Sequence, residues 1–156
     1  MKVDFITPFV TAAYDVLQLE VNAEIDRGEL SIEQSSNTSQ EVTVLVGVTG
    51  EVRGLAMYGM SESTAKKIVS AIVKHPVPIF DEMAQSATAE LGNVITGRAS
   101  TNLSAVGFDC VLTPPTLITG RQVIISTLTI RRLVVPLHTN FGDIEINLAL
   151  REEKNE

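Results

Sequence analysis

The chain has 156 residues, of which 44% are apolar, and its 19 acidic and 12 basic side chains give a formal net charge of −7. This length is sufficient for one domain with its own hydrophobic core. The negative charge argues against a nucleic-acid partner, because binding to a phosphate backbone depends on lysine and arginine side chains that displace counterions. The single cysteine, Cys110, excludes an internal disulfide, and no Cys/His cluster has the spacing of a metal site.

Neither a signal peptide nor a membrane span is indicated. The N-terminus lacks both a basic run and a continuous apolar stretch. The most apolar segment, residues 124–137, is interrupted by Arg131 and Arg132 and is too short to cross a bilayer. We therefore expect a cytoplasmic protein without membrane insertion, with one domain over residues 1–151 and a charged, frayed tail over residues 152–156.

The first half of the chain predicts a helix followed by strands. Apolar residues recur at helical spacing from about residue 4 to residue 20. Alternating apolar and polar residues then predict three strands, at 23–34, 41–49 and 52–60. A polar loop at 35–39 separates the first two, and Gly50–Glu51 turns the chain between the last two. A hairpin is therefore expected near residue 50.

The second half predicts further helices and strands. Ser61 is expected to cap a helix that ends before Pro76, and the longest helical pattern runs from 79 to 97, with Gly97 as its C-cap and a short helix after it. A strand meander is expected over 122–130, 133–138 and 143–150. Each half begins with a helix that leads into strands, which indicates a weak internal duplication. We expect an α+β fold, with an antiparallel-rich sheet and amphipathic helices packed on it.

The third predicted helix carries a polar stripe. Each helical residue advances by about 100°, so Ser86, Glu90 and Asn93 lie within a wedge of about 60°, with Glu82 at its edge and Gly97 continuing it. The neighbouring face is apolar and is expected to meet the core: Phe80, Met83, Ala84, Ala87, Leu91, Val94 and Ile95.

The middle of this helix contains two poor helix formers, Gly92 and Asn93. Together they cost the helix on the order of 1 kcal/mol relative to better choices. We infer that something other than helix stability favours them. Ordinary solvated helix residues are the alternative interpretation of the stripe.

The segment over 80–97 resembles the signature helix of the CheC/CheX/FliY chemotaxis phosphatases. That signature has Asp or Ser, three residues, Glu, two residues, Asn, and then Gly four residues further on. Ser86, Glu90, Asn93 and Gly97 fill these positions without a gap.

Two further features resemble the CheX type of this family. The chain opens with Thr7-Pro8-Phe9, similar to the start of the CheX helix, and it carries the motif once. CheC-like relatives have a second copy in the first helix, where this chain has Asp15 followed by Gln18. One site per chain is therefore expected.

The resemblance implies a phosphatase that hydrolyses the aspartyl phosphate of a CheY-type response regulator in two-component signalling. Asn93 would position the attacking water, and Glu90 would pair with the lysine of the receiver's active site. Glu82, Ser86 and Gly97 would contact the partner. The resemblance also implies a homodimer. We expect no metal bound by this chain, and Mg²⁺ in the partner receiver.

Two other functions stay open. The chain could be a non-catalytic CheC-like module that docks on a receiver or on a flagellar switch protein, although the presence of both Glu90 and Asn93 counts against this. It could also be a purely structural dimer. The sequence does not identify the cognate receiver.

Overall fold

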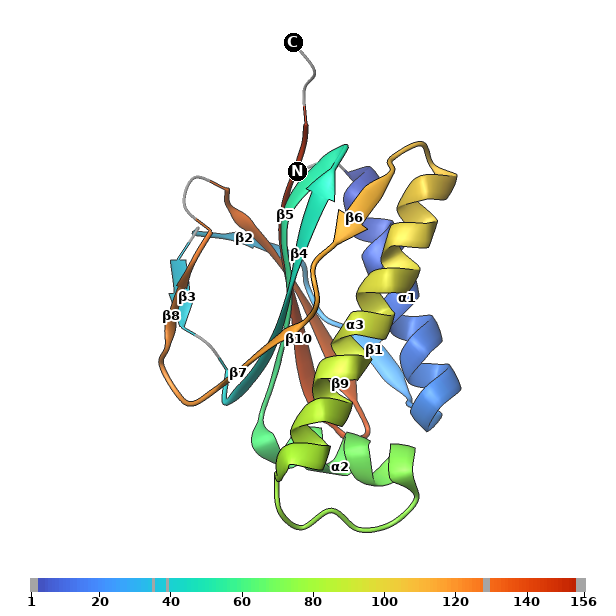
Figure 1. Cartoon of the computed structure of the whole chain (residues 1–156), viewed down its shortest axis with the longest axis vertical. Helices are drawn as coiled ribbons and strands as arrows, with labels where there is room; N and C mark the ends of the chain where they lie inside the picture. The colour runs from blue at the N-terminus through green and yellow to red at the C-terminus, as the bar shows by residue number, and fades with distance from the viewer. Residues whose placement is uncertain (1–2, 35, 39, 128–129, 154–156) are drawn as a thin grey trace.

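The computed structural model describes residues 3–34, 36–38, 40–127 and 130–153. This part of the chain forms a helical layer on an antiparallel sheet (Figure 1). The helices are α1 (Val3–Val21), α2 (Glu62–Val73) and α3 (Glu82–Ala105). α1 and α3 lie side by side over one face of the sheet, and α2 lies across one end of it (Figure 1). The predicted α+β class is confirmed.

Within the described residues the main sheet has eight strands, and the path β1-β9-β10-β5-β4-β6 is joined by β2 beside β9 and β7 beside β4. Each of its pairings is antiparallel. A separate two-stranded sheet pairs β3 with β8 on the side away from the helices (Figure 1). The bounds are β1 (Ile25–Arg27), β2 (Ser31–Glu33), β3 (Ser36–Thr38), β4 (Val42–Gly50), β5 (Val52–Met60), β6 (Cys110–Leu112), β7 (Thr116–Thr119), β8 (Ile124–Ser126), β9 (Arg132–Thr139) and β10 (Gly142–Glu152).

The core lies between the helices and the central strands. The valines at alternate positions of β4 are all buried, because every second side chain of a strand points to the same face: Val42, Val44, Val46 and Val48. Helix α1 buries an aromatic and aliphatic stripe against the same core. Its Phe5 ring meets Phe108 edge-on, with ring centroids 5.2 Å apart and planes at 82°. The predicted hairpin between β4 and β5 is confirmed, with Val42 opposite Met60 and Val48 opposite Gly54.

The strand predictions need three corrections. The segment 23–34 forms two short strands, β1 and β2, rather than one. The predicted loop at 35–39 contains β3. In the segment 122–130, where residues 128–129 lie outside the described part, only 124–126 form a strand, and β8 pairs with β3 rather than joining a meander with β9 and β10. These pairings join residues far apart in sequence, so local alternation does not reveal them.

Two chain positions also differ from expectation. Gly97 does not end α3, which continues to Ala105 with Val106 as its C-cap, so no second short helix follows. A glycine alone is a weak helix breaker, and the buried Ala99 and Leu103 beyond it hold the last turns against the core. Glu152, assigned to the tail, is the last residue of β10, while residues 154–156 lie outside the described part.

Candidate functional site

Helix α3 begins at a side-chain cap. Asp81 has extended backbone angles, φ −80° and ψ −175°, and its carboxylate accepts a hydrogen bond from the amide of Ala84 at 3.0 Å. A cap of this kind satisfies one of the amides that lack a partner in the first turn of a helix. The helix therefore starts at Glu82 rather than at residue 79. The first member of the polar stripe is also the first residue of the helix.

The five residues of the predicted site lie along one side of α3. Glu82, Ser86 and Glu90 are exposed, and Asn93 and Gly97 are partly buried. The side chains of Glu90 and Asn93 make no hydrogen bond or ion pair with any described residue. A carboxylate and a carboxamide one turn apart are therefore available to an external partner. The roles of these residues stay predictions.

A buried hydrogen-bond chain anchors the middle of α3 to the sheet. The Thr96 hydroxyl donates to the Gly92 carbonyl at 2.7 Å, which leaves its oxygen to accept from the Tyr58 hydroxyl, also at 2.7 Å. Burial raises the pKa of Tyr58 far above its ordinary value of 10.0, so the phenol stays protonated. Tyr58 belongs to β5, and the sequence contains no local signal for this contact. The anchor lies on the turn that carries Asn93.

Gly92 lies close against the sheet. A Cβ atom at this position would lie 2.5 Å from Val44 Cγ1 and 3.0 Å from Val44 Cβ. Real Cβ atoms do not approach other carbon atoms this closely, so the packing of α3 on β4 requires glycine here. The inference that helix stability did not select Gly92 is correct, and the reason is core packing. Gly92 therefore gives no support to a functional interpretation of the stripe.

The apolar face of α3 is narrower than its helical pattern predicts. Ala84, Leu91 and Ile95 are buried as expected. Met83 and Val94 are not, with exposed fractions of 42% and 40%. Both lie on the side of the helix that also carries Glu90.

Charges around the site are partly paired. Arg98, one residue after Gly97, forms an ion pair with Asp15 of α1 at 3.4 Å. This ion pair joins α3 to α1. Glu82 and Glu90 make no ion pair with described residues, so the stripe itself is acidic.

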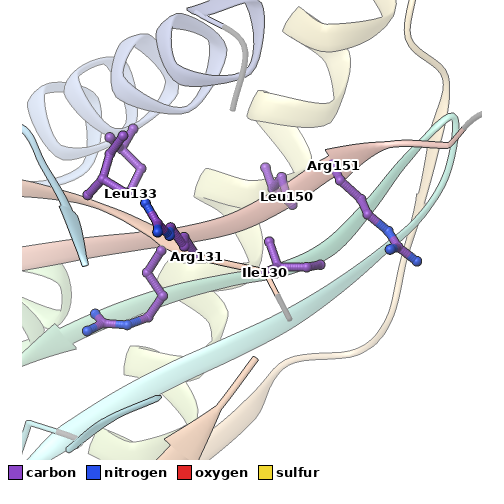
Figure 2. A pocket seen from close by; sticks show the side chains of 7 residues that line it. Ile130, Arg131, Leu133, Leu150 and Arg151 are labelled. Atoms are coloured by element: carbon purple, nitrogen blue, oxygen red, sulfur yellow. The ribbon is translucent and has the colours of Figure 1, made fainter. Parts of the chain in front are cut away.

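A hollow of about 380 Å³ lies elsewhere in the molecule, and no residue of α3 lines it. Figure 2 shows Arg131 and Arg151 extending away from each other on either side of Ile130. The backbone carbonyl of Gln34 accepts a hydrogen bond from Arg132, which is buried in the wall of this hollow. The candidate site is therefore a helix surface, and its geometry suits a macromolecular partner rather than a small enclosed ligand.

Among the described residues, no group of three or more His, Cys, Asp and Glu side chains has the arrangement of a metal site. No helix in the described part of the chain is long and apolar enough to cross a membrane.

The fold is that of the CheC-like proteins. A CheC-like superfamily protein from Shewanella superposes with a TM-score of 0.88 at 24% identity, covering 97% of this chain and 99% of that one. A sequence model described as chemotaxis phosphatase CheX matches residues 42–138. The chain belongs to the CheX family of chemotaxis phosphatases.

Two relatives carry more specific descriptions. The CheY-P phosphatase CheX of Thermotoga maritima is 26% identical over 153 residues, which cover 97% of this chain and 98% of that protein. A CheX–CheY–BeF3–Mg²⁺ complex from Borrelia burgdorferi contains a chain that is 32% identical, with a TM-score of 0.83 and coverage of 97% of this chain and 100% of that chain.

Proposed function

We propose that this protein hydrolyses the aspartyl phosphate of a phosphorylated CheY-type response regulator, with Asn93 positioning the attacking water and Glu90 pairing with the lysine of the receiver's active site. The observation that supports this most directly is that both side chains are available, one turn apart, on a helix anchored to the sheet. The description of the Thermotoga maritima relative as a CheY-P phosphatase supports the same reaction.

Hydrolysis of the aspartyl phosphate requires few catalytic groups from the phosphatase itself. Hydrolysis of an acyl phosphate needs a water in line with the bond to the leaving oxygen and a divalent cation that neutralises the phosphoryl oxygens. The carboxamide of Asn93 offers both an acceptor and donors, so it can hold such a water in one orientation. We propose that Mg²⁺ enters with the receiver, and the presence of Mg²⁺ in the Borrelia burgdorferi complex supports this.

Glu90 has a different proposed role. Its exposed carboxylate can pair with a cation on the partner before and during the reaction, so it contributes to binding as well as to alignment. Ser86 and Glu82, exposed one and two turns before Glu90, are proposed partner contacts without a chemical role.

The test is receiver dephosphorylation at saturating enzyme. Asn93→Ala should lower the maximal rate by on the order of 10² or more while leaving affinity for the receiver nearly unchanged, because a group that orients water acts mainly in the transition state. The matched control is Gln18→Ala, which removes an exposed carboxamide from α1. Wild-type turnover in Asn93→Ala would show that α3 is only a docking surface and that the catalytic assignment of Asn93 is wrong.

Glu90→Lys tests the pairing with the receiver's lysine. Replacing the carboxylate with an ammonium group places like charges together, so affinity for the receiver should fall, and Ser86→Ala should have a milder effect than either site variant. Glu20→Lys makes the same charge change at an exposed position on α1 and should bind normally. Equal affinities of Glu90→Lys and Glu20→Lys would contradict the pairing.

A homodimer through sheet contacts is also proposed. Several large apolar side chains on the strands are exposed, including Ile32 at 64%, Val111 at 68% and Ile124 at 75%. Val111 lies on β6, the terminal strand of the sheet path, where unpaired backbone groups favour strand addition. Sedimentation at tens of micromolar tests this, and a monomer would contradict the dimer but not the proposed catalysis.

A further inference from the structure

Three large apolar side chains are exposed on α3 or in the segment just before it. Met83 and Val94 lie about 60° and 80° around the helix from Ser86, on the side to which Glu90 also turns. Ile79, in the segment before the helix, is 70% exposed. Along the helix Glu90 lies between Met83 and Val94, about 10 Å from the first and 6 Å from the second at 1.5 Å per residue.

Gly97 is a second unexplained feature of the same surface. It lies inside α3 without a positive φ, and a Cβ atom at this position would meet nothing within 4 Å. Glycine is a poor choice for a helix interior, and alanine would fit here without a contact. Gly92, five residues earlier, is accounted for by Val44, but no described residue accounts for Gly97.

We propose that Ile79, Met83, Val94 and Gly97 form a docking ridge for the phosphorylated receiver. The apolar side chains pack against the receiver's surface, and the bare backbone at Gly97 lets a receiver loop approach closely enough for Asn93 to reach the phosphoryl group. This inference rests on the proposed function and adds the residues that set affinity and approach.

The position of the ridge identifies its occupant. Because Glu90 lies between Met83 and Val94, anything that covers these two side chains also covers the polar stripe. A permanent cover, such as a second copy of this chain, would block Asn93 from a substrate. A partner that binds and leaves, and whose reacting group meets Asn93, is therefore the receiver itself. A small ridge of this kind is typical of transient signalling interfaces.

Electrostatic attraction alone does not account for binding of the receiver to this surface. The stripe carries two carboxylates, Glu82 and Glu90, on a protein with a net charge of −7, and the approaching phosphoryl group is also negative. Apolar burial does not depend on the sign of charge, so it can hold the complex while Glu90 finds its cationic partner.

The experiment measures kcat, KM and Kd for Met83→Ser, Val94→Ser and Gly97→Gln. The binding probe is a CheY-type receiver activated with BeF3 and Mg²⁺, chosen from a panel as the one that the wild-type chain dephosphorylates fastest. Each serine variant should raise KM and Kd about tenfold while leaving kcat within about twofold, as expected when a packed interface side chain is truncated.

Gly97→Gln adds a side chain that suits a helix and points into open space. It should raise KM and Kd by about tenfold or more, because the side chain occupies the volume into which the receiver approaches, while the urea midpoint stays at or above that of the wild type. Leu19→Ser, at an exposed apolar position on α1, is the matched control and should change neither constant. Met83→Leu should restore most of the affinity that Met83→Ser loses.

The outcomes separate the ridge from the catalytic proposal. Wild-type KM and Kd in both Met83→Ser and Val94→Ser, or in Gly97→Gln, would overturn the ridge even if Asn93→Ala were inactive. Loss of affinity in the ridge variants together with wild-type turnover in Asn93→Ala would support the ridge and refute the catalytic role of Asn93.

Discussion

The two glycines of α3 provide a direct test of how this helix sits on the sheet. Alanine at Gly97 removes the helix penalty of glycine and meets no neighbour, so Gly97→Ala should raise the free energy of unfolding by about 0.5–1 kcal/mol. Alanine at Gly92 gains the same propensity but places Cβ 2.5 Å from Val44 Cγ1. The same substitution, five residues apart in one helix, should therefore change stability in opposite directions.

The magnitude at Gly92 follows from the surroundings of Val44. This side chain is fully buried, and its Cβ would also be 3.0 Å from the new methyl group, so a change of rotamer cannot relieve the overlap. The helix must shift, and overpacking of this kind costs about 1–3 kcal/mol. After the propensity gain, Gly92→Ala should be net destabilising, by up to about 2 kcal/mol, and the melting temperature should fall by about 2–4 °C for each kcal/mol in a domain of this size.

Urea unfolding followed by circular dichroism measures both variants at one protomer concentration, because association would otherwise shift the midpoint. Val44→Ala, which makes room for the methyl group, should rescue Gly92→Ala, so the double variant should lose less stability than the sum of the two single variants. A Gly92→Ala protein as stable as the wild type, or additive single variants, would show that the approach of α3 to β4 does not require glycine.

Three further predictions concern the anchor, acid stability and the metal. Thr96→Val leaves the buried Tyr58 hydroxyl without its partner and should cost about 1–3 kcal/mol, more than the roughly 1 kcal/mol expected for Tyr58→Phe; equal losses in urea unfolding would contradict the hydrogen-bond chain. A hydrogen bond from Arg121, and then the amide of Glu62, hold the pKa of Glu41 below its ordinary value of 4.5. Its contribution to stability is therefore present above pH 4.5 and is lost as the pH falls through the lower folded-state pKa. Glu41→Gln should accordingly lose less stability than the wild type on acidification below that pH, and an unchanged acid profile would contradict this. Chelation should stop dephosphorylation and Mg²⁺ should restore it, whereas metal analysis of the purified chain should find no stoichiometric Zn²⁺ or Fe. Tightly bound metal in the isolated protein would refute that expectation.

Several elements follow from local sequence alone. The three long predicted helices form, although the short helix expected after Gly97 does not, and the predicted Ser61 cap is present, with its hydroxyl accepting a hydrogen bond from the amide of Thr64 at 3.1 Å. The alternation of β4 and β5 correctly predicted their hairpin. The stripe of Ser86, Glu90 and Asn93 on one helix side also follows from spacing. These features depend on residues within a few positions of each other, so contiguous sequence contains the information that specifies them.

Other features depend on residues distant in the chain. Gly92 is required by Val44, and Thr96 is anchored by Tyr58, yet neither strand residue is near the helix in sequence. The same dependence explains why the pairing of β8 with β3 was not predicted.

The sequence by itself determined that a carboxylate and a carboxamide share one side of α3, because the helical repeat places Glu90 and Asn93 together whatever lies beneath them. Only the tertiary structure decided which neighbouring side chains of α3 are exposed and where the helix requires glycine. The angle and depth at which α3 packs on β4 leave Met83 and Val94 in solvent and make glycine necessary at position 92 but not at position 97. Packing depth depends on the side chains that meet across the interface, and the periodicity of one helix does not contain them.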